Sequence, residues 1–206
     1  MMPPFNRRDF LRLLSGVGLA AASGGVLRPA AADEVDTPED TAVQGGFRAG
    51  DRVPNFYVRA ITGPLHSKSV CYVCRNGDRP VAMVLVRRIV PELESLLQGL
   101  DCVVDSHRAE GLRSFAVFVS RDSRRLLPQV QTLAFNGKIG LPLTIAAAPA
   151  EGPGLRGLPE DIAVSVVLYR EQTVRSALAF RDEELSPEAV ERVVKATREL
   201  AELERP

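Results

Sequence analysis

The chain has 206 residues, and its 26 lysines and arginines are balanced by 26 aspartates and glutamates. This balance, without a basic patch or a nucleic-acid-binding motif, argues against a nucleic acid partner. The chain has no tryptophan, no long apolar run and no internal repeat, and its two histidines and three cysteines restrict the metal and thiol chemistry it can carry.

The first 32 residues are predicted to be an export signal. Residues 6–12 read NRRDFLR, which resembles the twin-arginine export motif. A mildly apolar run at 13–27 follows, shorter than the ~20 residues of a membrane-spanning helix. Ala30 and Ala32 then offer the small residues of a cleavage site. Cleavage would leave no stable membrane span and a periplasmic or otherwise extracytoplasmic protein, whereas the alternative is an uncleaved anchor.

Removal of this signal changes the charge of the chain, because residues 1–32 contain four arginines and one aspartate. The mature protein is therefore mildly acidic. Its first segment, 33–47, is acidic and polar, which is typical of a flexible linker. The remaining residues, 48–206, are expected to form one domain that is long enough to bury a core.

The first elements of this domain are predicted from turn signals and apolar patterns. A short alternating strand at 57–60 and an arm at 69–72 are expected to pair as a hairpin around the turn 62–64. A second turn is expected at 75–78. The continuously apolar run 81–86 follows, which is typical of a buried parallel strand.

Helical and strand patterns alternate in the rest of the chain. Helical spacing of apolar residues runs from Leu93 to Val104, with Gly111 as the terminator. A second helix, of uncertain length, is expected to end at Asn136; Asp122 is a plausible cap for it, but Pro128 complicates so early a start. The other predicted elements are strands at 115–119 and 141–145, a loop at 147–159, a hairpin of 164–169 and 174–180 around Glu171 and Gln172, and a terminal helix that Ser186 caps and Pro187 begins.

Two segments carry a resemblance to a known family. Gly50, Asp51, Pro54 and Phe56 match the pattern G-D-x-x-P-x-F, and residues 78–81 match the segment that leads into the first core strand. Over 48–203 the chain resembles exported thioredoxin-like and peroxiredoxin-like proteins. The resemblance implies an α/β fold, a thioredoxin-like three-layer sandwich with an N-terminal β-hairpin extension.

Two positions depart from the pattern of this family. The family carries its redox or peroxidatic cysteine after the core strand, where residues 86–91 of this chain read VRRIVP. The family also places a cis-proline just before the strand of the terminal hairpin, where this chain has Val164. Thioredoxin-type catalysis therefore does not transfer directly to this protein.

Cys71 and Cys74 form the main candidate site, because C-x-x-C is the spacing of redox dithiols. In a regular strand their Cα atoms would be about 10 Å apart, whereas a disulfide needs less than about 7 Å. Pairing therefore requires a turn between them. No helix N-terminus is expected here to activate a thiol, and Cys71 is the expected attacking residue because Cys74 lies closer to the buried strand.

A metal or cofactor site has little support. His66 lies five residues before Cys71 and could add a third ligand to the cysteine pair, which is a weak constellation for zinc or copper. Haem attachment requires C-x-x-C-H, and Arg75 follows Cys74. No cofactor and no metal are therefore expected.

Three further residues have both a functional and a simpler interpretation. Cys102 lies opposite the apolar stripe of its predicted helix, which indicates an accessible thiol; the alternative is a half-buried small side chain. Arg87 and Arg88 end a core strand, where they could receive an anion; the alternative is a solvated basic pair.

Two functions remain open at this point. One is an exported thiol–disulfide redox protein that uses Cys71 and Cys74 on the thiols and disulfides of partner proteins. The other is a catalytically silent thioredoxin-fold binding or interaction module, in which the same pair is a structural disulfide.

The export signal gives the first testable prediction. We expect mass spectrometry of the exported protein to find an N-terminus near Asp33, because the small residues of the cleavage site end at Ala32. Recovery of the intact precursor alone, in the cytoplasm or the membrane, would contradict this expectation. Replacing Arg7 and Arg8 with lysine is expected to retain the precursor inside the cell.

Overall fold

The computed structural model describes residues 46–120, 122–146 and 158–202. The chain divides into two units, Met1–Glu39 and Asp40–Pro206, and all the described residues belong to the second unit. The predicted signal, most of the predicted linker and most of the loop 147–159 therefore lie outside the described residues.

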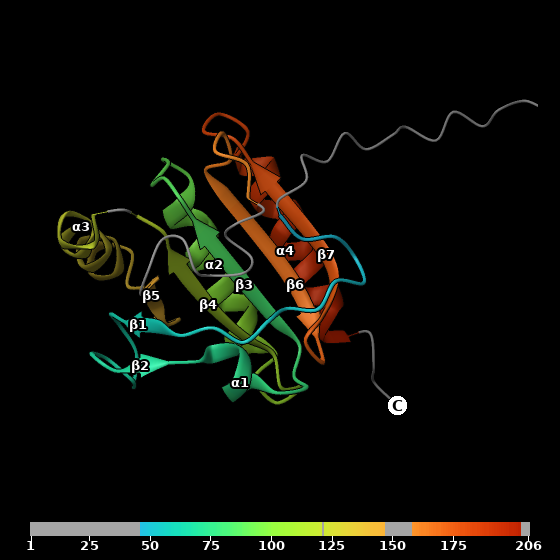
Figure 1. Cartoon of the computed structure of the whole chain (residues 1–206). Helices are drawn as coiled ribbons and strands as arrows, with labels where there is room; N and C mark the ends of the chain where they lie inside the picture. The colour runs from blue at the N-terminus through green and yellow to red at the C-terminus, as the bar shows by residue number, and fades with distance from the viewer. Residues whose placement is uncertain (1–45, 121, 147–157, 203–206) are drawn as a thin grey trace, which may run out of the picture. The chain divides into compact units, whose positions relative to one another are not determined.

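The described residues form seven strands and four helices (Figure 1). In chain order they are β1 (Val58–Ala60), β2 (Ser69–Val70), α1 (Tyr72–Asn76), β3 (Val81–Val86), α2 (Leu93–Ser106), β4 (Arg113–Phe118), α3 (Ser123–Asn136), β5 (Leu143–Ala146), β6 (Val164–Arg170), β7 (Thr173–Phe180) and α4 (Pro187–Glu202).

All seven strands join one sheet in the order β2-β1-β5-β4-β3-β6-β7. β3 pairs parallel with β4 and antiparallel with β6, and all six of its residues are buried. The prediction that 81–86 and 115–119 form neighbouring central strands is confirmed. The terminal hairpin is confirmed as β6 and β7, and the N-terminal hairpin as β1 and β2.

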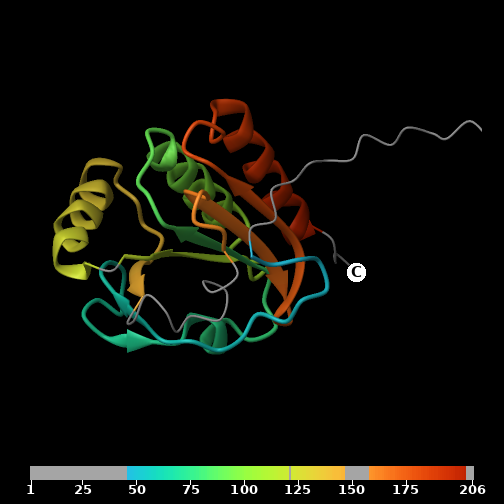
Figure 2. The ribbon, with the colours of Figure 1, turned by 45° about the horizontal axis from the view of Figure 1, so that its top comes forward.

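The two faces of the sheet are covered differently. α2, α3 and α4 lie on one face, and α1 lies on the other with the segment before β1 (Figure 2). β3, β4 and β5 are adjacent and parallel, and each step across the sheet runs in the same direction. Because such crossovers have one hand, α2 and α3 fall on the same face. The predicted three-layer α/β sandwich is confirmed, with α1 in its thinner outer layer.

Local capping signals explain where α3 and α4 begin. Asp122 Oδ1 accepts a hydrogen bond from the Arg125 N–H at 3.1 Å, and Ser186 Oγ accepts one from the Ala189 N–H at 3.3 Å. Both predicted caps are confirmed. The β6–β7 turn is also confirmed, with positive φ at both Glu171 and Gln172, as a tight two-residue hairpin turn requires.

Two local predictions are wrong. The arm predicted at 69–72 ends at Val70, because α1 begins at Tyr72. The turn predicted at 75–78 is present one residue later, at 76–79, where the Arg79 N–H donates to the Asn76 carbonyl. α2 ends at Ser106, well before Gly111, because the chain must reverse to reach β4 and the Leu112 N–H donates to the His107 carbonyl. Gly111 adopts a φ of 88° in that reversal instead of ending the helix.

Gly99 of α2 gives a packing prediction. A Cβ added there would lie 2.8 Å from Val194 Cγ2 of α4, and a β-branched side chain in a helix has little rotamer freedom to move away. We expect Gly99→Ala to lower the free energy of unfolding by roughly 1 kcal/mol net, since overpacking outweighs the gain in helix propensity.

In a Val194→Ala background the same Gly99→Ala change is expected to raise the free energy of unfolding by about 0.8–1.0 kcal/mol, the propensity gain alone. Urea unfolding of the four proteins measures both effects. An effect of the same sign in both backgrounds would show that the α2–α4 contact does not require glycine.

Candidate functional site

Cys71 and Cys74 are joined by a disulfide across the first turn of α1. Their Cα atoms are 5.3 Å apart, which is within the range that a disulfide requires. The turn needed between the two cysteines is therefore helical, and Cys71 is the N-cap residue of this helix. The prediction that no helix N-terminus is available here is wrong.

The two cysteines differ in hydrogen bonding and in exposure. The Cys74 N–H donates to Cys71 Sγ at 3.1 Å. Cys71 is only 6% exposed, whereas Cys74 is exposed. This order is the reverse of the prediction, because Cys71 directly follows β2 under the sheet while Cys74 lies on the outer side of α1.

α1 is fixed by the two side chains between the cysteines. Val73 is fully buried, and the Tyr72 ring stacks on Phe115 of β4 with centroids 5.1 Å apart. Burial raises the pKa of Tyr72, and the charge of Arg75 opposes this shift. The disulfide is therefore held against the sheet by aromatic and aliphatic packing.

Tyr169 of β6 lies buried on the same face of the sheet as α1. Its pKa is raised by burial, which the Asn76 side chain of α1 partly opposes. The two side chains do not form a hydrogen bond of good geometry, so Tyr169 Oη has no partner within the described residues.

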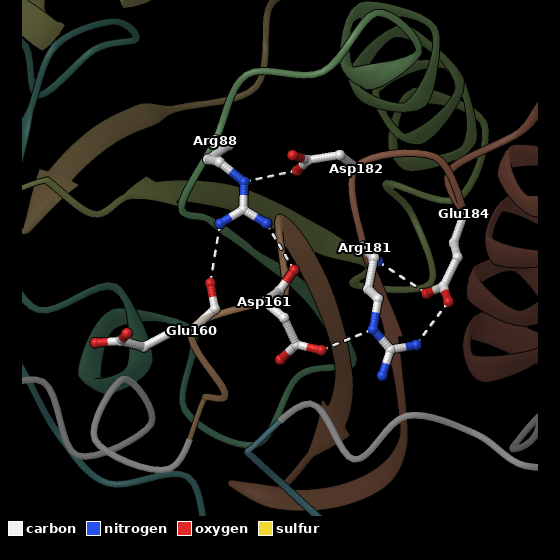
Figure 3. A network of polar contacts seen from close by, with 6 residues as sticks. All are labelled: Arg88, Glu160, Asp161, Arg181, Asp182 and Glu184. Carbon is white, nitrogen blue, oxygen red and sulfur yellow. Dashed lines mark hydrogen bonds and ion pairs between the residues drawn. The ribbon is translucent and has the colours of Figure 1, made fainter.

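The opposite end of β3 holds a network of ion pairs and hydrogen bonds (Figure 3). Arg88 Nε pairs with Asp182 Oδ1 at 2.6 Å, and its Nη1 and Nη2 donate to the carbonyls of Glu160 and Asp161 at 2.9 and 2.6 Å. The solvated-pair interpretation is therefore wrong for Arg88. The Arg87 guanidinium also donates to a carbonyl, that of Leu158, at 2.8 Å. Arg87 Nε, in contrast, is buried with no hydrogen-bond partner among the described residues.

Arg181 extends this network. Its Nε pairs with Asp161 Oδ2 and its Nη1 with Glu184 Oε1, both at 2.7 Å, and its N–H donates to Glu184 Oε2 at 2.9 Å. The hydrogen bond from the Arg181 side chain lowers the pKa of Asp161, and the hydrogen bond from its backbone N–H lowers the pKa of Glu184. The network ties residues 160–161 to the start of the β7–α4 loop.

Val164 at the start of β6 and the preceding Ala163 are fully engaged in strand pairing. Val164 pairs with Val86 of β3 and with Phe180 of β7. Just before it, the Ala163 N–H donates to the Phe180 carbonyl, and the Ala163 carbonyl accepts from the Arg87 N–H, both at 2.8 Å. Both positions where this chain departs from the family pattern, residues 86–91 and Val164, therefore lie at one end of β3. α1 lies toward the other end (Figure 1).

The remaining candidate residues stay apart. Cys102 is exposed on α2, so the helical-wheel prediction is confirmed and the half-buried alternative is wrong. The His66 ring contacts Ser67 Oγ. No three His, Cys, Asp or Glu side chains of the described ranges are grouped so that they could hold a metal ion. The structure therefore brings together Cys71 and Cys74 only.

Comparison with known proteins was informative at the level of structure. No protein-family model and no curated protein matches the chain. AhpC of Mycobacterium bovis is 14% identical with a TM-score of 0.58, covering 78% of this chain and 96% of its own length. A secreted thiol-disulfide isomerase of Corynebacterium glutamicum is 14% identical with a TM-score of 0.54, covering 73% and 85%.

A secreted Mycobacterium tuberculosis disulfide oxidoreductase homologous to E. coli DsbE is 11% identical with a TM-score of 0.51, covering 68% of this chain and 95% of its own length. Similarity at these identities establishes the thioredoxin-like fold and nothing further. Within the described part of the chain, no helix is both long enough and apolar enough to cross a membrane.

The Arg181 network gives a prediction on pH dependence. Because the native pKa values of Asp161 and Glu184 are lowered, their contribution to stability is present above the unfolded-state pKa values, about 4. It is lost as the pH falls through the lower native values. We expect Arg181→Gln to be less stable than the unchanged protein at pH 7, with a difference that shrinks toward pH 3.

Urea unfolding between pH 7 and pH 3 measures this difference. The effect is expected to be small because the network is exposed. Arg175→Gln is the matched control, since Arg175 is an exposed arginine of β7, the strand that directly precedes Arg181. A difference for Arg181→Gln that does not change with pH would rule out the carboxylate pairing as its cause.

Proposed function

We propose that this protein is an exported thiol–disulfide exchange protein that acts through Cys71 and Cys74. The observation that carries the proposal is the disulfide across the first turn of α1, with one exposed and one buried cysteine. A dithiol of this kind needs one sulfur that partners can reach and one that can leave and return. Protein thiols and disulfides are the proposed partners.

The oxidising half-reaction begins at Cys74. A partner thiolate attacks Cys74 Sγ, a mixed disulfide forms, the Cys71–Cys74 bond breaks, and Cys71 leaves as a thiolate. A second partner thiolate then attacks the partner sulfur of the mixed disulfide and releases Cys74. Two partner thiols lose two electrons and two protons and become a disulfide, while the protein gains a dithiol. A more oxidising partner disulfide regenerates Cys71–Cys74 by the reverse exchange.

Cys71 is suited to be the leaving group because a better-stabilised thiolate leaves faster. The Cys74 N–H, 3.1 Å from Cys71 Sγ, points at the position where the negative charge develops. Burial of Cys71 acts in the opposite direction, since desolvation disfavours a thiolate. A helix of five residues adds little to the single hydrogen bond, so we expect slow exchange compared with dedicated oxidoreductases.

Export is part of the proposal. The motif NRRDFLR and the short apolar run support a signal at 1–32, followed by a linker at 33–47 and the thioredoxin-like domain at 48–206. Two of the similar structures are described as secreted proteins. An extracytoplasmic compartment would also permit the disulfide to persist.

A silent binding module with a structural disulfide is the second candidate function. Two observations favour it. At the end of β3 where the family has its cysteine, Arg88 and Arg181 form ion pairs. Tyr72 and Val73, between the two cysteines, are packed into the core. In this case the disulfide would serve only to hold α1 in place.

The reduction potential of the pair separates the two functions. In a Cys102→Ser protein we expect a value between about −120 and −270 mV, the range of exchange proteins. Equilibration in glutathione or dithiothreitol buffers, followed by alkylation and mass spectrometry, measures it. A potential below about −300 mV, typical of structural disulfides, would overturn the exchange function and leave the binding module.

Two single-cysteine proteins test the assignment of roles within the pair. With Cys102 replaced by Ser, we expect Cys71→Ser to form a mixed disulfide with oxidised glutathione faster than Cys74→Ser does, because only Cys74 is exposed. Faster reaction of Cys71 would restore it as the attacking residue.

A further inference from the structure

A cavity of about 270 Å³ lies beside α1, at the end of the sheet where the central strand β4 begins. α1 contributes Tyr72 and Arg75 to its wall, Arg79 follows α1, and Arg108 and Arg113 flank the turn between α2 and β4. We call this the α1 cavity. Neither Cys71 nor Cys74 lines it, so it is separate from the disulfide although both use α1.

The wall of the α1 cavity carries an excess of positive charge. Asp101 is its one carboxylate, and Asp101 Oδ2 already accepts the Gly140 N–H at 2.7 Å. Of the four arginines only Arg108 has a carboxylate partner within the described residues, Asp105 at 2.5 Å. Arg75, Arg79 and Arg113 therefore have no ion-pair partner in the described part of the chain.

Arg113 is the most constrained of these arginines. Its Nη1 donates to the carbonyls of Leu112 at 2.7 Å and Arg108 at 3.3 Å. Burial lowers the pKa of Arg113, and the charges of Arg79 and Arg108 lower it further. An anion among these three arginines would relieve their mutual repulsion.

Tyr72 supplies an independent observation. The residue is 7% exposed, and its hydroxyl is buried with no hydrogen-bond partner among the described residues. A buried hydroxyl without a partner is costly, and the stack on Phe115 fixes the ring that carries it. The oxygen of a bound anion would supply the hydrogen-bond acceptor that the Tyr72 hydroxyl lacks.

The rest of the wall is largely apolar. Pro64 and Leu65, between β1 and β2, and Pro142, just before β5, contribute apolar side chains to it. Since a water molecule takes up about 30 Å³, the cavity has room for a ligand of roughly ten non-hydrogen atoms. A ligand that fits must therefore be small and carry both an anionic group and an apolar body.

We propose that the α1 cavity binds a small organic anion, a carboxylate or phosphate on a compact apolar body. The anionic oxygens form ion pairs with Arg79 and Arg113 and accept a hydrogen bond from the Tyr72 hydroxyl. The apolar body packs on Pro64, Leu65 and Pro142. This binding does not require Cys71 and Cys74 to exchange disulfides, so it stands or falls separately from the proposed redox function.

Isothermal titration of the full-length protein with benzoate, phenyl phosphate and inorganic phosphate tests this site. We expect benzoate, phenyl phosphate or both to bind with a Kd below about 1 mM, and inorganic phosphate to bind more weakly because it lacks the apolar body. The preferred organic anion identifies the carboxylate or the phosphate class. Failure of both organic anions to bind at 10 mM would overturn the proposal.

Two variants place the binding in the α1 cavity. Tyr72→Phe keeps the ring and its stack but removes the hydroxyl, and Arg79→Gln removes an exposed charge. Each is expected to weaken binding roughly tenfold or more, as for loss of a hydrogen bond to a charged group. The controls are Tyr57→Phe and Arg175→Gln, both exposed residues outside the cavity, which should bind unchanged.

Far-UV circular dichroism and the melting temperature check that each variant is folded. Binding that survives unchanged in both Tyr72→Phe and Arg79→Gln would show that the anion binds elsewhere and would overturn the assignment. The same titrations on a protein with all three cysteines replaced by Ser should still show binding, which separates this result from the outcome of the redox measurements.

Discussion

Burial of β3 on both faces is the constraint on which the rest of this structure depends. Val81, Met83 and Leu85 point into the core beneath α1, and Ala82, Val84 and Val86 into the core beneath α2 and α4. A strand that is apolar on both sides must have a pairing partner at each edge and a covering layer on each face. β4, β6 and the helices supply these, so the position of every other element is set relative to β3.

The same strand separates the two regions that matter for function. In the family that this chain resembles, chemistry is expected after the first core strand, at its carboxyl end. Here Arg88 and Arg181 form ion pairs with carboxylates at that end, and the N–H and carbonyl of Ala163 are both hydrogen-bonded. The disulfide and the α1 cavity instead lie toward the start of the strand, where α1 packs on Phe115. The position where the family has its cysteine and the Cys71–Cys74 disulfide of this chain therefore lie toward opposite ends of β3.

Most of the fold could be predicted from the sequence because its signals are local or strongly periodic. The run 81–86, the helical spacing after Leu93, the caps Asp122 and Ser186 and the turn at Glu171 all act within a few residues, and each is present as expected. Pro128 complicated the prediction of where this helix begins, and the structure places it inside α3, which begins at Ser123.

The candidate site was harder to predict because its features depend on tertiary contacts. α1 has only five residues, too few to give a periodic pattern, and it is stabilised by the stack of Tyr72 on Phe115, a residue more than forty positions away. The relative exposure of the two cysteines follows from which side of α1 meets the sheet. The arginines of the α1 cavity come from three separate segments, so their proximity has no signature in the linear sequence.

The short spacing of the disulfide has a consequence for the energetics of the whole chain. Cys71 and Cys74 are only three positions apart, so the bond closes a very small loop and removes little entropy from the unfolded chain. The loop-closure relation gives about 2 kcal/mol for such a ring, against about 4.7 kcal/mol for one of a hundred residues. The large apolar core formed around β3 does not depend on that bond. We therefore expect the domain to remain folded when this bond is reduced, with any structural change confined to α1.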